Sequence, residues 1–155
     1  RGGRYVPEGL TVSCSDRGRR RALAVLGACA LVAALPALAQ DPRLTQAQAA
    51  GKAWLVLADA DDASRTYKTA AARFRKTVPE DKWPEAFRVA RGQFGKNLRR
   101  ALVSTQPSNG TPTDPGEFVV MIFRSSFEKR DDAVETLTIE READGTWRVA
   151  GYLMR

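Results

Sequence analysis

Three polar side chains, Glu135, Arg124 and Tyr67, share the apolar positions of the elements in which they lie. Glu135 has the same strand parity as Leu137 and Ile139, so its carboxylate is expected to point toward the core. Arg124 shares its parity with alternate residues of the apolar run before it, and Tyr67 lies on the apolar face of a predicted helix. A desolvated carboxylate can act as a general base, and a guanidinium and a phenol can stabilise negative charge beside it. The sequence therefore predicts candidate catalytic residues between helices and sheet, with Glu135 as the base.

A structural ion pair explains Glu135 equally directly. The residue lies near the end of its predicted strand, where Arg124 or Arg148 can pair with it across the sheet. Burial of a charge without a partner is costly, so we prefer this interpretation and expect Glu135 to be paired.

The residue inventory excludes most other reaction classes. The 155 residues include no histidine and only two cysteines, Cys14 and Cys29, both in the N-terminal segment. Histidine bases, thiolate nucleophiles and Cys/His metal sites are therefore not expected. The segment Asp59-Ala60-Asp61-Asp62 lacks the glycine and the distal glutamate of a calcium loop, and we expect it to cap a helix. No cofactor or metal site is predicted.

Residues 1–39 have the pattern of an export leader. An arginine cluster precedes an uncharged apolar run of fourteen residues, and small residues then provide a cleavage site between Ala39 and Gln40. We expect export to the periplasm or secretion, with 40–155 as a single domain and residues 1–16 as sequence upstream of the true start. An uncleaved membrane anchor and lipid attachment at Cys29 are the alternatives.

Charge is distributed unevenly along the chain. The net charge of +7 falls to +3 for 40–155, so the basic composition comes largely from the leader and does not indicate nucleic-acid binding. Residues 65–100 have a net charge of +8, whereas 101–155 have −3. An ordinary solvated helix face explains this asymmetry, and peripheral contact with an anionic envelope surface is the alternative.

Hydrophobic periodicity predicts three helices followed by about four strands. The strand 118–123 consists of six apolar residues, a pattern typical of a strand covered on both faces. Asp144-Gly145 predicts a hairpin turn. In the last strand, alternation places Trp147, Val149 and Leu153 on one face and Tyr152 on the other. The predicted helices are 45–58, 63–78 and 80–94, the strands are 98–105, 118–123, 133–142 and 146–154, and 106–116 is a loop with Asn109-Gly110-Thr111 at its tip.

This order indicates an α+β fold, with N-terminal helices packed on one face of a curved antiparallel sheet. Five aromatic residues are expected to form the core rather than a platform for a ligand. They are Trp54, Trp83, Phe87, Phe94 and Trp147.

Several segments between residues 47 and 154 resemble the exported bacterial proteins of domain-of-unknown-function family 4019. They include Ala53-Trp54-Leu55-Val56-Leu57-Ala58-Asp59, Pro115-Gly116-Glu117-Phe118 and Asp144-Gly145-Thr146-Trp147. The resemblance implies a cone of the cystatin-like and nuclear-transport-factor-like type, with a curved sheet wrapped on helices. It implies no activity. Relatives of that fold include both enzymes and binding modules, so the fold does not choose between them.

Three functions are therefore expected in order of preference. The first is a non-enzymatic exported module that binds a small ligand or an envelope protein through the sheet cavity or the outer sheet face. The second is a small acid/base enzyme of the isomerase, dehydratase or hydrolase type that uses Glu135, Tyr67 and Arg124. The third is an envelope-surface protein held by the basic helices. Homodimerisation is compatible with the sequence, although no residue requires it.

Overall fold

The structure of the protein is a computed structural model that describes residues 41–155. The chain divides into two units, Arg1–Ala37 and Leu38–Arg155, and all described residues belong to the second unit. The predicted leader, its cleavage site between Ala39 and Gln40, and Cys29 lie outside the described residues.

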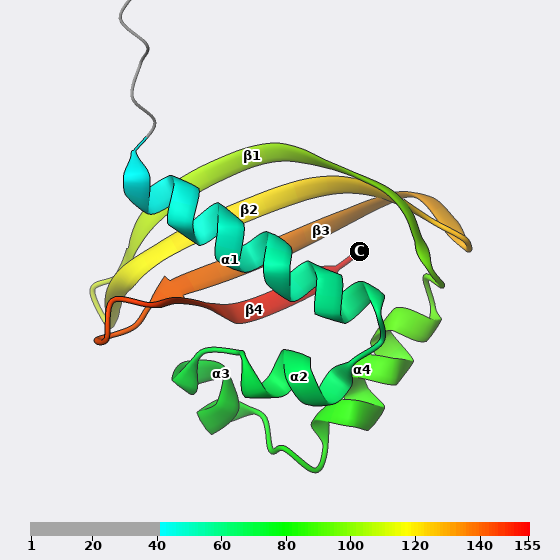
Figure 1. Cartoon of the computed structure of the whole chain (residues 1–155), viewed down its shortest axis with the longest axis horizontal. Coiled ribbons are helices and arrows are strands. Elements are labelled where there is room, and N and C mark those ends of the chain that lie inside the picture. Colours follow the sequence, from blue (N-terminus) through cyan, green and yellow to red (C-terminus); the bar gives the residue numbers. More distant parts are fainter. Residues whose placement is uncertain (1–40) are drawn as a thin grey trace, which may run out of the picture. The chain divides into compact units, whose positions relative to one another are not determined.

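Four helices precede a sheet of four antiparallel strands in the order β1-β2-β3-β4 (Figure 1). The helices pack on one face of the sheet, which confirms the predicted α+β class and adds one helix to the predicted three. The helices are α1 (Pro42–Asp59), α2 (Ala63–Lys68), α3 (Ala72–Thr77) and α4 (Trp83–Gly92), and the strands are β1 (Asn97–Thr111), β2 (Asp114–Phe127), β3 (Arg130–Arg141) and β4 (Trp147–Met154).

Helix α1 lies against the middle of the sheet. Asp41 caps its first turn by accepting a hydrogen bond from the Arg43 amide at 2.9 Å. Its buried side packs in one cluster with the inward residues of β2 and β3, and Gly51 lies against Leu137 and Met121. A Cβ atom on Gly51 would lie 3.0 Å from both Leu137 Cδ2 and Met121 Sδ, so the absence of a side chain allows helix and sheet to pack closely.

The core has the predicted aromatic composition. Trp54, Phe87, Phe94 and Trp147 are buried, and Trp83 is half-buried against them. Gly95 follows the end of α4 in a left-handed backbone conformation, with φ of 77°. Its amide donates a hydrogen bond to the Arg91 carbonyl.

The prediction of one continuous helix over 63–78 is wrong, because the chain forms α2 and α3 with a break between them. Ala70 and Ala71 are buried at this break. The Ala71 amide donates to the Val149 carbonyl of edge strand β4 at 2.8 Å. The break therefore provides a hydrogen-bond donor for the Val149 carbonyl at the sheet edge. In a continuous helix the Ala71 amide would bond within the helix instead.

The prediction of a loop over 106–116 is also wrong. β1 and β2 continue through this segment as one long hairpin, so Asn109 lies in a strand rather than at a loop tip. Pro107 pairs opposite Val119. The sheet accepts this proline because β1 is an edge strand, where a missing amide proton need not break a ladder hydrogen bond. Gly110 has φ of 77°, a conformation that glycine adopts without strain.

The predicted hairpin turn at Asp144-Gly145 is confirmed, with Gly145 at φ 80°, but the predicted faces of β4 are only half right. Trp147 and Val149 are buried as expected. The register then shifts, because Val149 pairs with Ile139 and Gly151 pairs with Thr138. This bulge turns Tyr152 toward the core and leaves Leu153 55% exposed, the reverse of the prediction.

Candidate functional site

Glu135 of β3 is the only buried carboxylate among residues 41–155, with a relative exposure of 0%. Its oxygens accept hydrogen bonds from Arg100 Nε at 2.6 Å and Arg100 Nη2 at 3.0 Å. Tyr152 donates to Oε1 at 2.5 Å, and the Ser125 hydroxyl donates to Oε2. Each of the other three strands therefore provides one inward-facing residue that donates to the Glu135 carboxylate.

A second carboxylate extends this cluster to the helices. Asp59, the last residue of α1, accepts hydrogen bonds from Arg100 Nη1 at 2.6 Å and Nη2 at 3.0 Å. Arg91 of α4 donates from Nη2 to Asp59 at 3.1 Å. We call Glu135, Asp59, Arg91, Arg100 and Tyr152 the polar cluster. Its two carboxylates and two guanidinium groups balance in charge, which reduces the cost of burying Glu135 and Arg91.

Arg91 is the least exposed cation of the cluster. Only 4% of the residue is exposed, and its guanidinium lies over the rings of Phe87 and Phe127 at 5.8 and 5.9 Å. Nη1 donates to the Tyr152 hydroxyl at 3.2 Å. Nε lies 3.4 Å from the Asp61 carboxylate and is buried without a hydrogen bond within the described residues.

The surroundings of Tyr152 and Arg100 shift the pKa values of both groups. Burial and the neighbouring Glu135 carboxylate raise the pKa of Tyr152 far above its ordinary value, so the phenol stays neutral and acts as a donor. Burial opposes the charge of Arg100, but hydrogen bonds to Asp59 and Glu135 outweigh it and raise the pKa of the guanidinium. Neither group is therefore suited to exchange a proton at neutral pH.

The two predicted partners of Glu135 are wrong. Arg124 is exposed, because from Val119 to Phe127 the buried residues of β2 alternate and Arg124 has the opposite parity. They are Val119, Met121, Phe123, Ser125 and Phe127. Arg148 pairs with Glu142 and Asp144 instead. The ion pair itself is present, but Arg100 provides it.

Tyr67 also lies apart from Glu135. It is buried as predicted, and its hydroxyl donates to the backbone carbonyls of Val78 at 2.8 Å and Arg75 at 3.2 Å. Its ring packs against Phe74. Tyr67 therefore fastens α3 to α2 and takes no part in the polar cluster.

Local sequence patterns indicate some of the polar-cluster residues that the sequence analysis did not predict. Arg91 lies four residues after Phe87 and three before Phe94, so it falls on the apolar face of its helix. Gly151 within a strand pattern is typical of a bulge, and a bulge would have turned Tyr152 inward. No local pattern identifies Arg100, because its partner depends on how β1 and β2 pair.

A cleft of about 230 Å³ opens beside the polar cluster, between α4 and the end of β4. Tyr152 and Arg91 belong to both the cluster and the cleft wall, and the remaining wall is mostly apolar. The principal apolar residues are Trp83, Phe87, Ala90, Phe94, Leu153 and Met154. This cleft is the opening through which a ligand would approach the cluster.

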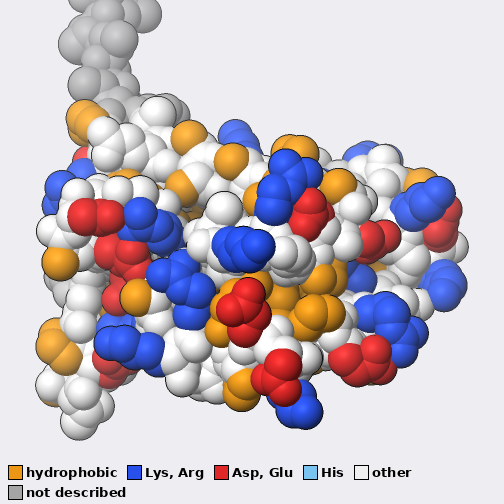
Figure 2. Space-filling view, turned by 60° about the horizontal axis from the view of Figure 1, so that its bottom comes forward, with side chains coloured by type: hydrophobic (Ala, Val, Ile, Leu, Met, Phe, Trp, Pro, Cys, Tyr) orange, Lys and Arg blue, Asp and Glu red, His pale blue; other side chains and the backbone are white. Residues whose placement is uncertain are grey.

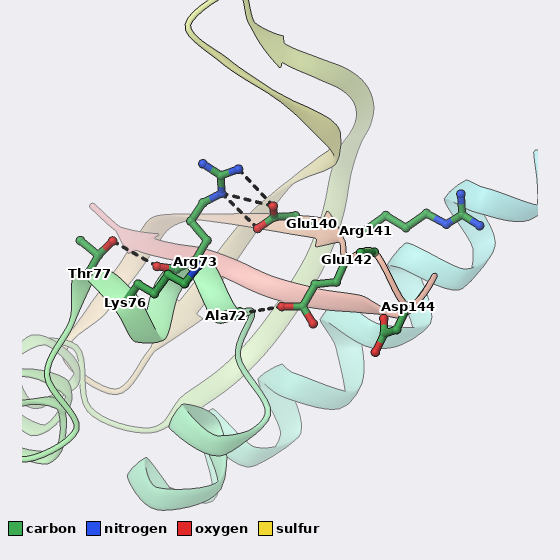
Figure 3. Close-up of a pocket in the computed structure, with 9 residues that line it drawn as sticks. Ala72, Arg73, Lys76, Thr77, Glu140, Arg141, Glu142 and Asp144 are labelled. Atoms are coloured by element: carbon green, nitrogen blue, oxygen red, sulfur yellow. Dashed lines mark hydrogen bonds and ion pairs between the residues drawn. The ribbon is translucent and has the colours of Figure 1, made fainter.

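A larger groove of about 680 Å³ lies between α3 and the β3–β4 hairpin (Figure 3). Three of its charged side chains, those of Arg73, Glu140 and Glu142, form contacts that join α3 to the sheet. Arg73 extends to Glu140, with Nε 3.1 Å from Oε2, and Glu142 accepts a hydrogen bond from the Ala72 amide at 2.5 Å. These contacts attach α3 to the sheet, so the groove is explained by docking of the helix.

The basic residues of 65–100 do not form a continuous cationic surface. Figure 2 turns the lower side of Figure 1, where α2, α3 and α4 lie, toward the reader. Acidic and basic side chains are interspersed there, with apolar side chains between them. Six of the eleven cations form ion pairs, which weakens the case for a basic helical layer that binds an anionic surface. The pairs are Arg65–Asp62, Arg73–Glu140, Lys82–Asp81, Arg88–Glu85, Arg91–Asp59 and Arg100–Glu135.

Two kinds of site are not found in the part of the chain that the structure describes. Among residues 41–155, no group of three or more potential ligand side chains is arranged to bind a metal ion. Asp62 instead caps α2 by accepting from the Arg65 amide at 2.8 Å. No helix over the same residues is long and apolar enough to span a bilayer.

Sequence comparison identifies the family of the chain. Residues 50–152 match the model of the family described as protein of unknown function (DUF4019), which is more than half of the chain, and the protein belongs to this family. No curated protein and no solved structure matches the chain. Kinship with the cystatin-like cone therefore stays a prediction.

Proposed function

We propose that the protein is an exported interaction module without catalytic activity, which binds an apolar side chain of a partner protein in the cleft between α4 and β4. The observation that carries this proposal is the saturation of Glu135. Its four hydrogen bonds fill the roughly four acceptor sites of a carboxylate, and it has no exposure to a substrate. A general base must reach the proton that it removes, so the acid/base alternative loses its central group.

The size and lining of the cleft favour an anchor side chain over a larger ligand. At about 230 Å³ it is smaller than typical small-molecule pockets, which have about 300–1,000 Å³. Its aromatic wall fits an apolar side chain. Buried apolar anchors of this kind dominate the affinity of many protein interfaces.

The predicted leader gives the proposed location. Export to the periplasm or secretion would bring the domain to envelope proteins as partners, and a fold without cysteine in 40–155 needs no disulfide there. N-terminal sequencing of the purified protein tests this part, and we expect the first residue to be Gln40.

Binding in the cleft can be tested by NMR titration with N-acetyl amino-acid amides. The leucine, phenylalanine and tryptophan derivatives should shift the Trp83 indole and Met154 methyl signals, whereas the serine derivative should not. Ala90→Leu fills the cleft and should abolish the shifts. Val89→Leu is the matched control, since Val89 is exposed on the same helix and does not line the cleft. Equal shifts in both variants would refute the site.

A further inference from the structure

The outer face of the sheet is the face opposite the one on which α1 lies (Figure 1). Along β3, buried residues such as Leu137 and Ile139 alternate with Val134, Thr136 and Thr138, which are half-buried. The bulge in β4 adds Leu153 to this outer face, where it pairs with Thr136. The resulting surface is apolar and hydroxyl-bearing at its centre.

The composition of β2 favours a cover on this face. Val119, Met121 and Phe123 fill the core, so the alternate residues Val120 and Ile122 point outward. An antiparallel sheet with one solvated face normally alternates apolar and polar residues, whereas a strand buried on both faces has a continuous apolar run. Arg73 of α3 covers only one end of this face, where its guanidinium lies over the ring of Phe118, and Val120 and Ile122 stay half-buried. We infer that a second copy of this chain covers the outer face and that the protein is a homodimer with stacked sheets.

The charges at the two ends of the outer face are complementary. One end carries Arg99 and Arg124, which are exposed and have no ion-pair partner among residues 41–155. At the other end, Asp114 and Glu140 share a single guanidinium, that of Arg73. A two-fold axis across the strands near the middle of β2 would place the cationic end of one copy over the acidic end of the other.

The area of the face is also adequate for a dimer. At about 3.3 Å per residue and about 4.8 Å between strands, the four strands present about 800 Å². One partner in an interface of standard size buries about 800 Å². Pairing through the free edge of β1 is disfavoured instead, because Pro107 and three register shifts interrupt that edge.

The inference can be tested by sedimentation equilibrium on protein purified after expression of the full chain. The parent protein should sediment as a dimer that dissociates on dilution over an about hundredfold concentration range. Ile122→Glu and Thr136→Arg each place a charge in the stacked face and should raise the dimer Kd at least about tenfold. Arg124→Glu should raise it more at low than at high salt.

Val56→Glu is the matched control. Val56 is 67% exposed on α1, on the other side of the sheet, so its substitution should leave the dimer Kd unchanged. Far-UV circular dichroism verifies that each variant is folded, and the exposed position of Arg124 keeps the test valid if the other two variants do not fold. A monomer at all concentrations would overturn the inference, whether the face is bare or covered by residues 1–40 or by another protein. A dimer that is indifferent to all three substitutions would also overturn it.

Discussion

Substitution of Glu135 by glutamine tests whether the polar cluster is structural. The amide nitrogen would replace an oxygen that accepts hydrogen bonds, and Arg100, its main neighbour, has only donors to offer. Removing one partner of a buried ion pair costs about 3–5 kcal/mol. Arg100 keeps its hydrogen bonds to Asp59, so we expect the lower value, about 3 kcal/mol of unfolding free energy. For a domain of this size, that loss lowers Tm by about 12 °C.

Guanidinium chloride unfolding followed by tryptophan fluorescence measures this loss, because Trp54 packs against Tyr152 with ring centroids 5.1 Å apart. Lys52→Gln is the matched control. Lys52 is exposed on α1, away from both proposed binding surfaces, and removing its charge should change the unfolding free energy by less than about 0.5 kcal/mol. If Glu135→Gln were no more destabilising than Lys52→Gln, the assignment of Glu135 as a structural centre would be wrong, and Glu135 would again be a candidate base.

The buried hydroxyl of Tyr152 and the close contact of Gly51 with the sheet give two further predictions. The pKa of Tyr152 is raised above its ordinary value of 10.0 by burial and by Glu135, so its contribution to stability is complete below about pH 10 and declines above it. Tyr152→Phe should flatten that alkaline decline in unfolding free energy, and an unchanged slope would contradict the assignment. Gly51→Val should cost about 2 kcal/mol, because its side chain overlaps neighbours 3.0 Å away, whereas Gly92→Ala, with no neighbour within 4 Å, should be neutral or stabilising by less than about 1 kcal/mol. Equal effects of the two glycine substitutions in thermal unfolding would refute the close contact.

Local periodicity was sufficient for the elements whose burial follows a regular repeat. Helix α1 and strands β2 and β3 lie where apolar spacing predicted them, and the parity of Glu135 correctly gave its inward direction. The same reasoning failed at α2 and α3, where spacing continues through the break. The deciding interaction there is the hydrogen bond from Ala71 to Val149, which joins residues that are far apart in sequence.

The partners of Glu135 could not be predicted, because they depend on strand register. Arg100 reaches Glu135 across β2, which requires the pairing of both β1 with β2 and β2 with β3. Tyr152 reaches it only after the bulge in β4. A single displaced residue reverses the faces of a strand, and sequence alternation cannot show where that displacement occurs. The sequence therefore identified Glu135, but it could not identify Arg100 and Tyr152 as its partners.

The bulge in β4 connects the buried cluster with both proposed binding surfaces. It turns Tyr152 toward Glu135 and the cleft, and it turns Leu153 onto the outer face. Without the bulge, regular alternation would place Leu153 inside and Tyr152 outside, and Glu135 would lose a hydrogen-bond donor in an environment where an unsatisfied carboxylate is costly. The polar cluster thus disfavours the alternative register of β4 more strongly than apolar packing alone would. A buried ion pair that adds little net stability can still select one register, and here that register defines which residues each surface presents.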